Sequence, residues 1–250
     1  MTDSGGRQQA LTGITWDSRQ LDFELIKPNP TALARFSTQL PKYIWDAAAL
    51  EGNSFESAEV EAALTGQFIA GRSIFDERQV GALKTAHDIL FQLVADERFA
   101  LTKTVSDSLH KLVAVHEALE VGHFRGQGLA TPGGGTVAVG AETFHASAPG
   151  KRGVVLVEEH RSLLEYLAEV ADPRERAIAY FCAATRRQFY WDGNRRTSRL
   201  MMMGELLTNG FDAISISGER RSEYNEHLTT MYLTGDASTL MAFLIDNRRS

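Results

Sequence analysis

One short segment of the chain, residues 188–199, combines residue types that bind phosphate. It reads Gln-Phe-Tyr-Trp-Asp-Gly-Asn-Arg-Arg-Thr-Ser-Arg and lies between two apolar stretches that predict helices. Asp192, Gly193 and Asn194 are typical of a tight turn that leads into a helix. The first turn of a helix offers unpaired N–H groups and a partial positive charge, so it attracts anions. Arg196 and Arg199 can project toward the same side of that turn, which indicates phosphate binding.

The same segment offers a carboxylate for a metal ion. Asp192 could hold Mg²⁺ that bridges phosphate oxygens, because magnesium sites often combine one or two carboxylates with phosphates. A simpler interpretation is also open. Asp-Gly-Asn is a common turn and helix cap, and arginines on a helix are usually solvated. The residue types alone do not decide between the two.

The order of the residues in this segment resembles the signature of the Fic family, H-P-F-x-D/E-G-N-G-R-x-x-R. Five positions match in register, namely Asp192, Gly193, Asn194, Arg196 and Arg199. Three positions depart from it. Gln188 stands in the histidine position, Phe189 replaces the proline and Arg195 replaces the second glycine. The resemblance implies a mostly α-helical Fic/Fido-type bundle with a small β-hairpin flap.

The resemblance also implies an activity. Fic enzymes move AMP from ATP onto a hydroxyl side chain of a target protein, and the motif histidine takes the hydroxyl proton. Gln188 cannot take that proton, because an amide has no accessible basic form. A positioned general base typically contributes about 10²–10⁴-fold. We therefore expect impaired transfer beside a retained nucleotide-binding loop, in which Gly193, Asn194, Arg196 and Arg199 hold the phosphates of ATP and Asp192 holds Mg²⁺.

Arg195 keeps a second interpretation open. The related Doc toxins carry a lysine at this position and transfer phosphate instead of AMP. The alternative is therefore an active AMP-transferase or a Doc-like protein kinase with a rearranged site. Against this, Doc retains its histidine, and Arg195 could simply point to solvent. The seven histidines of this chain all lie outside the motif, and none is assigned as a substitute base.

A second segment resembles the inhibitory helix of the family, whose pattern is S/T-x-x-x-E-G/N. Residues 49–54 read Ala-Leu-Glu-Gly-Asn-Ser, and Ala47 stands where the pattern has serine or threonine. In the family, the glutamate pairs with the second motif arginine and blocks productive seating of the ATP γ-phosphate. By correspondence, Glu51 would pair with Arg199. The resemblance therefore implies the class with an N-terminal inhibitory helix.

Helical patterns dominate the elements that must position these residues. We expect a flexible N-terminal tail, short strands or extended arms at 14–16 and 23–26, and a strand at 136–139 that forms a hairpin or flap. The expected helices cover 31–40, 42–50, 57–65, 76–95, 105–118, 157–170, 174–187, 195–208, 219–233 and 237–246. Either Ser54 or Ser57 would cap the helix over 57–65. Residues 1–40 would form the tail with a short extended or helical segment, and residues 41–250 a Fic-like domain with an inhibitory-type helix near 44–52.

Composition limits the partners and the compartment. The net charge of −6 argues against a general affinity for nucleic acid. Cys182 is the sole cysteine, so an internal disulfide is excluded, which suits a reducing compartment. The sequence has neither an N-terminal apolar signal region nor a run long enough to span a bilayer. We expect a cytoplasmic protein that binds nucleotide and either a target protein with a hydroxyl side chain or a regulatory partner, without nucleic acid or membrane.

Overall fold

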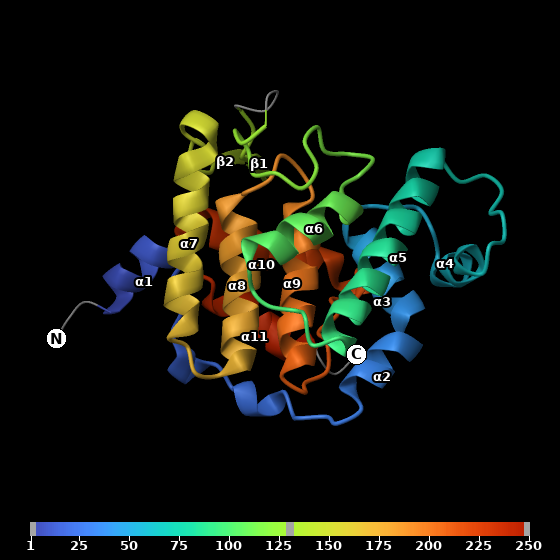
Figure 1. The fold of residues 1–250 in the computed structure, drawn as a ribbon, viewed down its shortest axis with the longest axis horizontal. Coiled ribbons are helices and arrows are strands. Elements are labelled where there is room, and N and C mark those ends of the chain that lie inside the picture. The colour runs from blue at the N-terminus through green and yellow to red at the C-terminus, as the bar shows by residue number, and fades with distance from the viewer. Residues whose placement is uncertain (1–3, 129–132, 248–250) are drawn as a thin grey trace.

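Two antiparallel helices form the centre of the computed structural model, which describes residues 4–128 and 133–247 (Figure 1). They are α8 (Pro173–Arg187) and α9 (Asn194–Thr208), and they pack along each other. Residues 177–185 of α8 and 196–207 of α9 are buried, so both helices are enclosed on all sides. Gly204 permits one of the closest contacts, because a Cβ there would lie 2.1 Å from the ring of Phe99.

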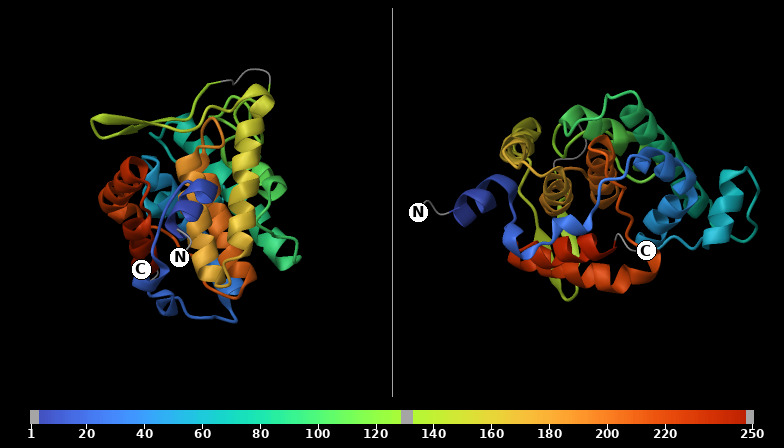
Figure 2. Two further views of the ribbon diagram at one scale, coloured as in Figure 1. Left: turned by 90° about the vertical axis from the view of Figure 1, so that its left-hand side faces the viewer. Right: turned by 90° about the horizontal axis from the view of Figure 1, so that it is seen from below.

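The other helices surround this pair (Figures 1 and 2). On one side α7 (Val154–Ala168) packs on α8 and carries α1 (Ser4–Thr12). Helices α5 (Ile74–Ala95) and α6 (Lys103–Val113) cover α9, and α3 (Leu40–Leu50) packs on α5. Helices α10 (Arg221–Thr234) and α11 (Ser238–Asn247) lie across the opposite face. The remaining helices are α2 (Ala32–Thr38), α4 (Ser57–Leu64) and the 3₁₀ turns Ser18–Gln20, Phe23–Leu25, Lys151–Gly153 and Gly218–Arg220.

A single hairpin lies at one end of the bundle within the described residues. Strands β1 (Thr136–Val139) and β2 (Glu142–His145) pair antiparallel, with Thr136 opposite His145 and Val139 opposite Glu142. We call residues 136–145 the flap. It projects over the end of α8 toward α10 (Figure 2). The expectation of a mostly helical bundle with one small hairpin is therefore confirmed.

The N-terminal region is more ordered than expected. The predicted flexible tail is wrong for residues 4–12, which form α1, and Arg7 makes an ion pair with Glu169 at the end of α7. Of the two alternatives for residues 23–26, a short strand or an extended arm, the strand is wrong, because Phe23–Leu25 is a 3₁₀ turn. Residues 14–16 contribute a single bridge, between Thr15 and Asp236. These segments pack on helices far away in the sequence, a signal that local periodicity does not contain.

The cap of α4 and the end of α6 also differ from the expectation. Neither Ser54 nor Ser57 caps α4. The cap is Glu56, whose backbone N–H donates to the side chain of Glu59 in a capping box. Helix α6 ends at Val113 instead of 118, and the following turn brings Glu117 to Arg196 of α9. No helix of the described residues is long and apolar enough to cross a membrane.

Candidate functional site

The loop between α8 and α9 is closed by hydrogen bonds of one side chain, that of Asn194. Its Oδ1 accepts from the N–H of Tyr190 at 2.8 Å, and its Nδ2 donates to the carbonyl of Tyr190 at 2.8 Å. The same Nδ2 donates to Oε1 of Gln188 at 3.0 Å. Asn194 thus fixes the shape of the loop and is also the first residue of α9.

Gln188 ends α8 in the left-handed conformation, with φ 51° and ψ 56°. Its Nε2 donates to the carbonyl of Thr185 at 2.7 Å and to the hydroxyl of Tyr232 at 3.0 Å. Since its Oε1 accepts from Asn194, both ends of the amide are engaged. The side chain at this position therefore anchors the loop and offers no basic atom.

Asp192 and Gly193 directly precede α9, and Gly193 is its N-cap. Gly193 has φ 72°, and a Cβ there would lie 2.9 Å from Cβ of Ala114, so this position needs glycine for both its conformation and its space. Oδ1 of Asp192 accepts from the N–H of Gly193 at 2.5 Å. The side chain of Asp192 is otherwise open to solvent, with 56% of its surface exposed, and lies 3.8 Å from Arg196.

His110, in α6, supports this loop through hydrogen bonds, a role that the sequence did not indicate. Its Nδ1 accepts from the N–H of Gly122 at 2.8 Å, so the proton is on Nε2, which donates to the carbonyl of Asp192 at 2.8 Å. Its ring stacks on that of Tyr190 at 3.8 Å. Burial lowers the pKa of His110 to about 4. Both nitrogens are occupied and the ring is neutral, so His110 positions the loop and does not act as a free base.

The two motif arginines bind different carboxylates. Arg196 forms a two-pronged ion pair with Glu117, in which Nη1 donates to Oε1 at 2.7 Å and Nη2 contacts Oε2. Arg199 instead donates from Nη2 to Oε1 of Glu51 at 2.8 Å. The pairing of Glu51 with Arg199 is present as expected. Glu117 was not foreseen, because no motif connects it to residues about 80 positions away.

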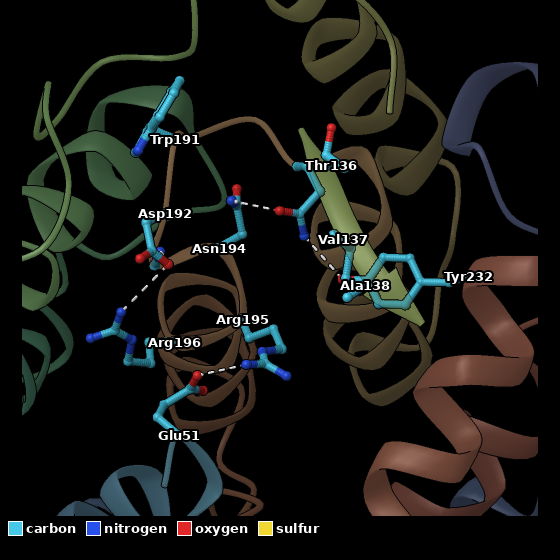
Figure 3. Close-up of a pocket in the computed structure, with 12 residues that line it drawn as sticks. Glu51, Thr136, Val137, Ala138, Trp191, Asp192, Asn194, Arg195, Arg196 and Tyr232 are labelled. Atoms are coloured by element: carbon cyan, nitrogen blue, oxygen red, sulfur yellow. Dashed lines mark hydrogen bonds and ion pairs between the residues drawn. The ribbon is translucent and has the colours of Figure 1, made fainter. Parts of the chain in front are cut away.

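Glu51 lies between two guanidinium groups at the end of α3. Its Oε2 accepts from Nη2 of Arg195 at 2.8 Å (Figure 3). This bond is in addition to the one between its Oε1 and Arg199. Burial favours the neutral acid, but the positive charges of Arg195 and Arg199 outweigh it and lower the pKa of Glu51 to about 2. The interpretation of Arg195 as a residue that simply points to solvent is wrong.

These residues surround a pocket of about 390 Å³. Its walls come from Glu51, Gln188, residues 191–196 at the start of α9, residues 136–138 of the flap and Tyr232 of α10. The flap is held over the pocket by Phe144, whose ring lies 5.0 Å from that of Tyr232 and 4.8 Å from the guanidinium of Arg186. Among the described residues no group of three or more His, Cys, Asp or Glu side chains is arranged to hold a metal ion.

The sequence is similar to those of curated protein adenylyltransferases named Fic. No family model matches the sequence. The protein adenylyltransferase Fic of Drosophila virilis is 24% identical over 212 residues, which are 82% of this chain and 40% of that protein. The same-named protein of Drosophila ananassae is 25% identical over 238 residues, 92% of this chain and 44% of that protein. The chain thus spans less than half the length of these curated relatives.

Solved structures share the fold. A Fic domain containing signaling protein from Bacteroides thetaiotaomicron matches with a TM-score of 0.68 and 19% identity, over 90% of this chain and 86% of that one. Fic-1 from C. elegans matches with a TM-score of 0.69 and 23% identity, over 87% of this chain and 62% of that one. The chain therefore shares the fold of Fic-domain structures, and most of its length is similar in sequence to Fic adenylyltransferases.

Proposed function

We propose that the chain binds a nucleotide in the pocket at the start of α9 and transfers AMP poorly or not at all. The relatives are named protein adenylyltransferases, and AMP transfer to a protein hydroxyl needs a group that accepts the hydroxyl proton. One observation carries the proposal. The side chain at the position of the family histidine is the Gln188 amide, whose Nε2 and Oε1 are both hydrogen-bonded within the loop.

The phosphate-binding part of the pocket keeps the residue types that such binding requires. Gly193 and Asn194 form the start of α9, which lines the pocket, and a helix N-terminus attracts phosphate. Arg196 adds a positive charge at the wall, and Arg199 adds a second one behind Glu51. We propose that these four residues bind the phosphates of ATP.

A magnesium ion would fit this arrangement when it arrives with the phosphates. The carboxylate of Asp192 faces the pocket, and only its Oδ1 is used, by the N–H of Gly193. Mg²⁺ commonly takes one or two carboxylates together with phosphate oxygens and water. We propose that Asp192 contributes the protein ligand and that the ion neutralises phosphate charge there.

Glu51 would then act as an inhibitory residue. Its carboxylate lines the pocket and occupies the guanidinium of Arg199, so a phosphate reaches that arginine only after Glu51 moves away. The partner would be a target protein with a hydroxyl side chain, or a protein that the chain regulates without modifying it. We propose the cytoplasm as the compartment, because the lone buried Cys182 suits a reducing environment.

Labelling with radioactive ATP tests the proposal. Wild type, Gln188→His and Glu51→Gly/Gln188→His are each incubated with labelled ATP, Mg²⁺ and a cell lysate. We expect no labelled protein with wild type and the strongest labelling with the double variant, because it restores a base and frees Arg199. Robust labelling by wild type would overturn the proposal and favour an active transferase. Label from the γ position instead of the α position would favour a Doc-like kinase.

A further inference from the structure

The carboxylate of Glu51 marks an anion position inside the pocket. Each of its oxygens accepts a hydrogen bond of 2.8 Å from a different guanidinium, one from Arg195 and one from Arg199. Arg199 is almost fully buried, and among the described residues its Nη1 has no hydrogen-bond partner. Charged hydrogen bonds from two arginines to one anion are the arrangement by which proteins bind phosphate.

The three arginines of α9 differ in how free they are to bind a ligand. The side chain of Arg196 is 3% exposed and holds both oxygens of Glu117, with a further bond to the carbonyl of Val113. That of Arg195 is 36% exposed, lines the pocket and has Glu51 as its carboxylate partner. If Glu51 leaves, Arg196 keeps its partner, whereas Arg195 and Arg199 lose theirs.

The pocket therefore contains two separate places for an anion. One is the start of α9, where Asn194 begins the helix. The other is the place that the carboxylate of Glu51 fills between Arg195 and Arg199. A nucleoside monophosphate can fill only one of them at a time, whereas a chain of phosphates can fill both.

We propose that Arg195 is a phosphate-binding residue that selects nucleotides with a polyphosphate chain, whose outermost phosphate replaces the carboxylate of Glu51. The inference rests on the proposed nucleotide binding and deepens it. Arg196 stays paired with Glu117 at the pocket wall, and Arg195 adds a further contact with the phosphate chain. A terminal phosphate is a dianion, so it can pair with the guanidinium groups of both Arg195 and Arg199. If Glu51 left and no anion replaced it, these two positive charges would be unpaired, which is unfavourable.

Calorimetric titration of ATP, ADP and AMP, each with Mg²⁺, tests the inference in the Glu51→Gly background. Arg195→Gln removes the charge and keeps the length of the side chain, and Arg195→Lys keeps the charge without the fork. Arg98→Gln is the matched control, because Arg98 is exposed and lies in the turn after α5. We expect Arg195→Gln to weaken ATP binding about tenfold or more and AMP binding less than about twofold. Arg195→Lys should recover part of the ATP affinity, and Arg98→Gln should match its parent.

The outcomes separate this inference from the proposed function. Equal losses for ATP and AMP would show a general effect of charge, and an unchanged ATP affinity would show that Arg195 does not touch phosphate. Either result overturns the inference and leaves nucleotide binding in place. If the melting curve shows that Glu51→Gly is folded but the variant binds none of the three nucleotides, the proposed function is wrong, and so is the inference that rests on it. If Arg195→Gln does not fold, an Arg195→Lys variant whose preference for ATP over AMP equals that of its parent overturns the inference, because lysine lacks the guanidinium that reaches Glu51.

Discussion

The side chain of Gln188 helps to shape the loop but supplies no base for the reaction. Asn194 shapes the loop through three hydrogen bonds, and Gln188 completes that network with its amide oxygen. A side chain at position 188 that can donate and accept is enough for this architectural role. Proton transfer needs a basic atom as well, which the amide lacks. The loop can therefore keep its shape without a basic group at position 188.

Gly193 gives a prediction at the scale of one residue. Gly193→Ala should destabilise the fold by about 1–2 kcal/mol for the left-handed conformation and by about another 1–3 kcal/mol for the contact with Ala114. Gly210→Ala is the matched control. Gly210 follows the other end of α9 with φ 76° and has open space around its Cβ position, so it should lose only the first amount. Urea unfolding of both variants checks this, and equal losses would contradict it.

Among the residues of the site, those within the motif could be predicted from the sequence and those outside it could not. Asp192, Gly193 and Asn194 are contiguous, so their turn and helix start follow from residue type. Glu117 and His110 reach the same loop from the end of α6, which is brought there by packing on α9. The partner of Arg195 was missed for the same reason, because it depends on where the end of α3 lies.

At the scale of elements, the site is a contact between the end of one helix and the start of another. Glu51 caps the C-terminus of α3, where the helix dipole disfavours a negative charge. Arg195 and Arg199, in the first turns of α9, lie where the dipole disfavours positive charge. Each end thus carries charges that its own helix does not favour, and the ion pairs between the two ends offset that cost.

Glu51→Gln tests this contact through stability. Removing one partner of a buried ion pair leaves uncompensated charges, so we expect a loss of about 3 kcal/mol at pH 7. Glu165→Gln, in the exposed ion pair with Arg161 on α7, is the control and should change stability by about 1 kcal/mol or less. Urea unfolding of both variants and wild type gives the comparison. A loss no larger than that of the control would contradict the account.

The pH dependence of that difference follows from the pKa of Glu51. Its pKa is about 2 in the folded chain against 4.5 as its ordinary value, so the carboxylate stabilises the fold above pH about 4.5 and this stabilisation is lost as the pH falls toward 2. The stability difference between wild type and Glu51→Gln should therefore be the same at pH 7 and pH 5 and smaller at pH about 3.5. A difference that already shrinks between pH 7 and pH 5 would show that Glu51 titrates higher.

For the whole molecule, the periodic helices were predictable and the connections between them were not. The apolar spacing of α5, α8 and α9 gave their positions to within a few residues, because each buries a regular face or its full surface. Helix α1 was missed because its weakly apolar sequence acquires order from α7, which lies about 150 residues further along the chain. The flap was expected from Thr136 and its neighbours. The contact between Phe144 of the flap and Tyr232 of α10, which holds the flap in place, could be seen only in the structure.

Binding without transfer is the central claim, and one measurement on Glu51→Gly tests it most directly. Mg²⁺ and ATP are titrated into the variant in a calorimeter, and the same samples are then analysed by intact-mass spectrometry, alone and with a lysate fraction. We expect saturable ATP binding that is tighter than in wild type, together with no protein that gains the mass of an AMP group, because Arg199 is free and Gln188 is unchanged. Transfer of AMP by this variant, or no binding of ATP to it, would contradict the account.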